Sequence, residues 1–101
     1  MTNPVDDLIG DNLLRAVAEV EGVDPSELEP WEVFKRVLEL VHLRETDFRA
    51  AMRLPHHVQL FPPGWYVSHG PDPLTAVLRV YLKVQYITRQ TRDNLSQSLG
   101  P

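Results

Sequence analysis

The chain has no cysteine among its 101 residues. This excludes disulfide bonds, zinc ribbons and thiol catalysis, and it predicts a protein of a reducing compartment such as the cytoplasm. The sequence also lacks a glycine-rich phosphate loop and the G-x-S-x-G and H-E-x-x-H patterns of hydrolases and metalloproteases. We therefore expect no enzymatic activity, no small-molecule substrate and no cofactor.

Long apolar runs are missing as well. No stretch approaches the roughly 18 apolar residues that a membrane span needs. The N-terminus, MTNPVDDLIGDN, has neither the basic start nor the apolar run of a signal peptide. We expect no membrane association. With 43% apolar and 24% charged residues, residues 1–101 are expected to form one globular domain.

Charge is distributed unevenly along the chain, which has a net charge of −4. Residues 1–50 carry 12 acidic residues against 5 lysines and arginines, whereas residues 51–101 carry 2 against 5. Opposite charge in the two halves suits head-to-tail self-association, and it also suits a domain with two differently charged sides.

Helical spacing of apolar residues covers most of the chain. It predicts a helix over 5–22, a short turn over 25–29, and a helix from Trp31 that either continues to Leu54 or pauses before a second piece at 46–54. Residues 74–95 fit two patterns, a strand-like alternation of about ten residues and a helical stripe of over twenty. The longer stripe favours a helix.

An apolar, proline-rich stretch separates these helical segments. Residues 58–60 alternate in polarity, the PPG at 62–64 is typical of a tight turn, and the WYV at 65–67 is typical of a returning strand. The sequence therefore predicts a mainly α fold of three to four helices, with one short β-hairpin at about 57–68 and a long C-terminal helix at about 73–95.

Three histidines lie near the predicted hairpin. His56, His57 and His69 have Asp72 close by in the sequence, and imidazole and carboxylate groups bind zinc or nickel. However, adjacent strand residues point to opposite faces, and no H-x-x-x-H spacing is present. We predict no metal site.

The split charge, the apolar interruption and the lack of a catalytic pattern together predict a non-enzymatic adaptor or assembly protein. It would bind a protein partner, other copies of itself as a homo-oligomer, or both, through the C-terminal helix and the hairpin tip. Exposed aromatic residues are typical of interfaces, although the same residues and the same helical stripe are also typical of a domain core. The predicted partner-binding residues are Phe61, Pro63, Trp65, Tyr66, Val80, Val84 and Ile87.

A second hypothesis is DNA binding. Val37, Val41, Leu43, Phe48 and Ala51 have helix-turn-helix spacing, and ETDFRAAMRL follows the turn. With a hairpin and a long last helix after it, the layout of residues 31–95 resembles winged-helix regulators that dimerise through the last helix. The resemblance implies a recognition helix at 46–54 and a wing at 57–68. The DNA-binding residues would be Arg44, Arg49, Arg53 and His57.

Overall fold

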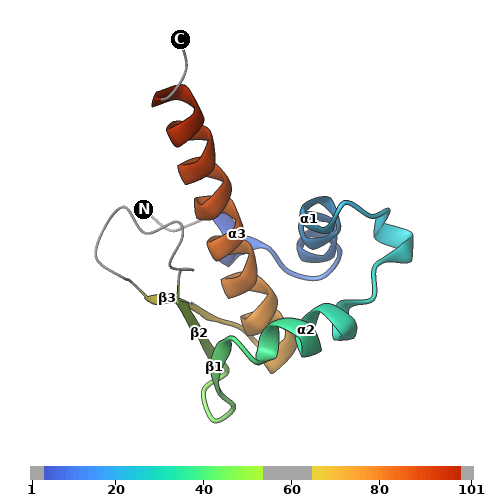
Figure 1. Ribbon diagram of the computed structural model, residues 1–101. Coiled ribbons are helices and arrows are strands. Elements are labelled where there is room, and N and C mark those ends of the chain that lie inside the picture. The colour runs from blue at the N-terminus through green and yellow to red at the C-terminus, as the bar shows by residue number, and fades with distance from the viewer. Residues whose placement is uncertain (1–3, 54–64, 99–101) are drawn as a thin grey trace.

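The computed structural model describes residues 4–53 and 65–98. In this part of the chain, a long helix runs between a three-stranded antiparallel sheet and two shorter helices (Figure 1). The elements in chain order are η1 (Pro4–Asp7), α1 (Asp11–Glu21), η2 (Pro25–Glu27), α2 (Pro30–Leu38), β1 (Val41–Arg44), β2 (Arg49–Arg53), β3 (Trp65–His69) and α3 (Pro73–Ser98).

The first helix is shorter than predicted because two glycines bound it. Gly10 has a φ of 58° and precedes α1, so the 3-10 turn η1 is separate from the helix. Gly22 adopts the left-handed conformation and donates its N–H to the carbonyls of the last turn, which ends α1. In the predicted short turn at 25–29, Asp24 caps η2 by accepting the N–H of Ser26 at 2.9 Å.

The mainly α prediction is wrong, because the structure is a mixed α/β domain. Helix α2 ends at Leu38, and residues predicted to continue the helix form β1 and β2, joined by a turn at 45–48. Along β2, Ala50 and Met52 are buried while their neighbours are less so. This period of two places every second side chain against α3, and that packing outweighs the local helical spacing.

The returning strand of the predicted hairpin at 57–68 has a partner that was not predicted. Trp65–His69 is a strand, β3, but its partner is β2, with Arg49 opposite His69 and Arg53 opposite Trp65. The sheet order is β1-β2-β3, with β2 in the middle. The predicted first half of the hairpin and the PPG turn lie outside the described residues.

The C-terminal helix agrees with the helical interpretation of 73–95. Asp72 caps α3 by accepting the N–H of Thr75 at 2.7 Å, and Pro73 occupies the first turn. The strand-like alternation of apolar residues within 74–95 reflects the packing of the helix on two sides. α3 packs on the sheet on one side and on α1 and α2 on the other, so it is apolar on several faces. Over residues 73–89, where the side chains of α3 are described, the buried residues are Thr75, Ala76, Val77, Leu78, Val80, Tyr81, Leu82, Val84 and Thr88.

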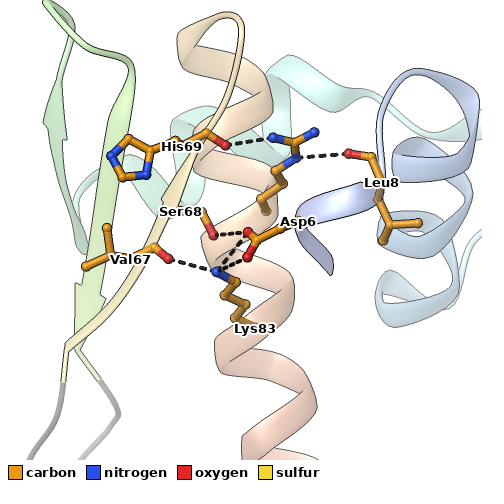
Figure 2. A network of polar contacts seen from close by, with 7 residues as sticks. Asp6, Leu8, Val67, Ser68, His69 and Lys83 are labelled. Atoms are coloured by element: carbon orange, nitrogen blue, oxygen red, sulfur yellow. Dashed lines mark hydrogen bonds and ion pairs between the residues drawn. The ribbon is translucent and has the colours of Figure 1, made fainter. Parts of the chain in front are cut away.

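Polar contacts fasten β3 and η1 to α3 (Figure 2). Lys83 extends from α3 to Asp6, with Nζ 2.8 Å from Oδ1, and it also donates to the Val67 carbonyl at 2.8 Å. One turn earlier, Arg79 donates to the His69 carbonyl at 2.8 Å and to the Leu8 carbonyl at 2.9 Å. The charged groups of Lys83 and Arg79 therefore bind partners within the same molecule.

The same contacts cover one edge of the sheet. The Gly70 N–H donates to the Phe48 carbonyl, so Phe48 and Gly70 form a hydrogen-bonded pair. In an antiparallel sheet every second pair is hydrogen-bonded, so Ser68 and Tyr66 point their backbone groups toward β2. By this alternation, the carbonyls of Val67 and His69 point away from β2, where Lys83 and Arg79 meet them. Covering an edge in this way prevents another strand from pairing there.

Candidate binding surface

The face of the sheet that points away from α3 carries a group of side chains that we call the outer sheet face. Its membership follows from the alternation along each strand and from the cross-strand register, because the intervening residues pack into the core. The outer sheet face consists of His42, Arg44, Arg49, Ala51, Arg53, Trp65, Val67 and His69.

This face is basic. It has three arginines and two histidines, and none of the residues of β1, β2 or β3 is acidic. Arg44 lies directly opposite Arg49 in the register of β1 and β2, and Arg49 lies opposite His69 in β3. Asp47, in the turn after β1, has Oδ1 3.9 Å from Nε of Arg44. Like charges directly across two strands reduce sheet stability. The Arg44–Arg49 pair is therefore unfavourable for the stability of the sheet.

An exposed aromatic group stands beside the arginines. The Trp65 side chain is 53% exposed, and its ring contacts the His42 ring edge-to-face, with centroids 5.0 Å apart. Ala51 lies between β1 and β3 on the same face, and its short side chain leaves room between the larger ones. The result is a shallow hollow of about 460 Å³, lined by His42, Arg44, Arg49, Ala51, Trp65 and Val67.

A second hollow lies on the helical side of the molecule, between α1, η2 and α2. It measures about 640 Å³ and is lined by Glu21, Val23, Glu27, Leu28, Glu29, Glu32, Val33 and Arg36. Residues 16–34 include six acidic residues and no lysine or arginine. We call the exposed residues Val23, Glu27, Glu29 and Glu32 the acidic helical surface.

One glutamate of this hollow has a structural role. Glu21 accepts hydrogen bonds from the Arg36 guanidinium and from the Tyr81 hydroxyl. Burial, reinforced by the hydrogen bond to Glu21, raises the pKa of the Tyr81 hydroxyl well above its ordinary value. The hydrogen bond to Glu21 likewise raises the pKa of Arg36. Glu21 therefore joins α1, α2 and α3, whereas the other glutamates remain at the surface.

Residues predicted under two different hypotheses meet on the outer sheet face. Arg44, Arg49 and Arg53 were expected to contact DNA and Trp65 to contact a protein partner, and all four share this face. The secondary structure around these arginines differs from the predicted recognition helix at 46–54. Residues 46–48 belong to a turn, and residues 49–53 form β2. The recognition helix of the winged-helix interpretation is thus absent from the described structure.

The other predicted site residues lie elsewhere. Val80 and Val84 are at most 1% exposed and belong to the core, Tyr66 points inward against that core, and Ile87 is half-buried. His57, Phe61 and Pro63 lie outside the described residues. Four further residues of the outer sheet face were not predicted to bind a partner or DNA: His42, Ala51, Val67 and His69. The alternation along 41–44 and 49–53 was the signal that could have placed the first two of them.

Among the described side chains, those of residues 4–53 and 65–89, no group of three or more histidine and acidic residues is arranged to hold a metal ion. None of the helices in that part is both long and apolar enough to cross a membrane. No family model matches the chain, and no curated protein or solved structure matches it.

Proposed function

We propose that this protein is a non-enzymatic adaptor or assembly protein that binds an acidic protein partner through the outer sheet face. The observation that carries the proposal is the combination of three arginines and an exposed tryptophan on a sheet face that is turned away from the core. Arginine and tryptophan are enriched among the residues that dominate binding energy at protein interfaces.

The charge of the whole chain favours a protein partner over a nucleic acid. A net charge of −4 opposes the approach of a polyanion, and the domain lacks the overall basic charge that marks nucleic-acid binders. An acidic segment of a protein needs only local complementarity. Its carboxylates would pair with Arg44, Arg49 and Arg53, while an apolar side chain would pack against Trp65 in the hollow.

The test uses a matched pair of charge reversals. Arg53→Glu changes an exposed arginine on the outer sheet face, and Arg15→Glu changes an exposed arginine on α1. Tagged wild-type protein and the Arg15→Glu variant should retain the same partner in a pull-down, whereas Arg53→Glu and Trp65→Ala should lose it. Equal retention by all four proteins would refute the proposal. So would binding of single-stranded DNA that only the outer-face variants lose, because that result assigns the face to nucleic acid.

A further inference from the structure

We propose that the acidic partner is a second copy of this chain, whose acidic helical surface docks on the outer sheet face. This inference rests on the proposed function and names its partner. It predicts head-to-tail association, in which each copy offers one basic and one acidic surface.

The first argument is charge complementarity between the two surfaces. The outer sheet face has three arginines and no carboxylate, whereas the acidic helical surface has Glu27, Glu29 and Glu32 within residues 16–34, which include no lysine or arginine. Arg36 also lines that hollow, but it is paired with Glu21. The lone lysine nearby, Lys35, pairs with Glu32 at 3.8 Å, and both side chains are 72% exposed. An exposed pair of this kind is weak, so Glu32 can exchange Lys35 for an arginine of another copy.

The second argument is that both surfaces combine charge with an apolar centre and a hollow. Trp65 stands in the hollow of the outer sheet face, and Val23, 41% exposed, lines the hollow of the acidic helical surface. A specific interface has an apolar centre with polar groups at its rim. Each surface can supply one half of that arrangement.

The third argument is placement in the fold. The two surfaces lie on opposite sides of α3, so they cannot meet within one molecule (Figure 1). When two copies associate through one basic and one acidic surface, the pair still has one of each free. Such a heterologous contact closes into a ring or extends into a chain.

Sedimentation velocity over a wide range of protein concentration tests the inference. The wild-type protein should associate as concentration rises, and the association should weaken from about 0.1 M to about 1 M salt, as the Debye length falls from about 10 to about 3 Å. Two double variants should each associate at least about tenfold more weakly than the wild-type protein. The sheet variant is Arg49→Glu/Arg53→Glu, and the helical variant is Glu27→Arg/Glu29→Arg. The single reversal Arg15→Glu should associate like the wild-type protein.

Mixing the two variants separates head-to-tail contact from misfolding. Each double variant has two surfaces of like charge, but an equimolar mixture again pairs unlike surfaces and should regain association. A chain with all four substitutions should also regain it, which shows that the substitutions do not prevent folding.

Three outcomes would overturn the inference: a wild-type protein that stays monomeric at every concentration, a helical variant that associates like the wild type, or a mixture that stays monomeric. In any of these cases, the pull-down still decides the proposed function. Loss of another captured protein by Arg53→Glu alone would keep the outer sheet face as a binding surface with a different partner.

Discussion

The ion pair between Lys83 and Asp6 allows a quantitative test of how the fold is held. The Lys83 side chain is 9% exposed, whereas the Asp6 side chain is 37% exposed. Breaking a buried ion pair by removing one partner costs about 3–5 kcal/mol, and most of that cost comes from the charge that stays behind. The two single substitutions should therefore differ, because the charges that they leave behind are solvated to different extents.

Asp6→Asn leaves the buried ammonium group of Lys83 without its carboxylate, with the Val67 carbonyl as an uncharged acceptor at 2.8 Å. We expect a loss of about 3 kcal/mol in the free energy of unfolding, at the lower end of the range because water reaches the Asp6 side. Lys83→Met keeps the apolar stem and leaves a carboxylate that water can reach and that Ser68 contacts at 3.4 Å. We expect a loss of about 1–2 kcal/mol for this variant.

Urea unfolding followed by circular dichroism measures both values. The double variant should lose less than the sum of the two single losses, because the second substitution removes the charge that the first one stranded. In thermal unfolding, Asp6→Asn should lower the midpoint by more than about 10 °C. A larger loss for Lys83→Met than for Asp6→Asn would refute this reasoning, and so would strict additivity in the double variant.

Three further outcomes follow from single contacts. Tyr81→Phe removes the hydroxyl bound to Glu21 and should cost about 1 kcal/mol in urea unfolding near neutral pH. The pKa of Tyr81 in the folded state lies above the unfolded value of 10.0, so the unfolded chain releases this proton at a lower pH than the folded chain. The free energy of unfolding of the wild-type protein should therefore fall as pH rises above 10.0, and that of Tyr81→Phe should fall less. Gly70→Ala would place a Cβ 2.8 Å from the backbone nitrogen of Ala76, and we expect a loss of about 1–3 kcal/mol; an unchanged midpoint would show that the start of α3 can shift. Ala51→Leu would fill the hollow of the outer sheet face, so it should abolish partner capture while the far-ultraviolet circular dichroism stays the same.

Arg49 and Arg53 were predicted to lie on a helix, and the structure places them on a strand. Residues 49–53, RAAMR, are strong helix formers, and their spacing from Val37 and Val41 fits a helical face. Both local signals therefore favoured a helix, whereas the observed strand depends on α3, which lies more than twenty residues further along the chain and covers Ala50 and Met52. The helix at 73–98 was predictable because its apolar stripe is longer than any strand of a small sheet.

Two groups of cations contact or line this sheet: one group stabilises the fold, and we propose that the other serves recognition. Arg79 and Lys83 reach backbone carbonyls of β3, and Lys83 also reaches Asp6, so their charges are satisfied within the molecule. The side chains of Arg49 and Arg53 form no hydrogen bond or ion pair with another described residue, and Arg49 lies opposite Arg44 in the register of β1 and β2. Stability alone would favour alternating charges across these strands. The arrangement supports the proposed binding role, because an acidic surface placed against these arginines would replace the repulsion between Arg44 and Arg49 with attraction.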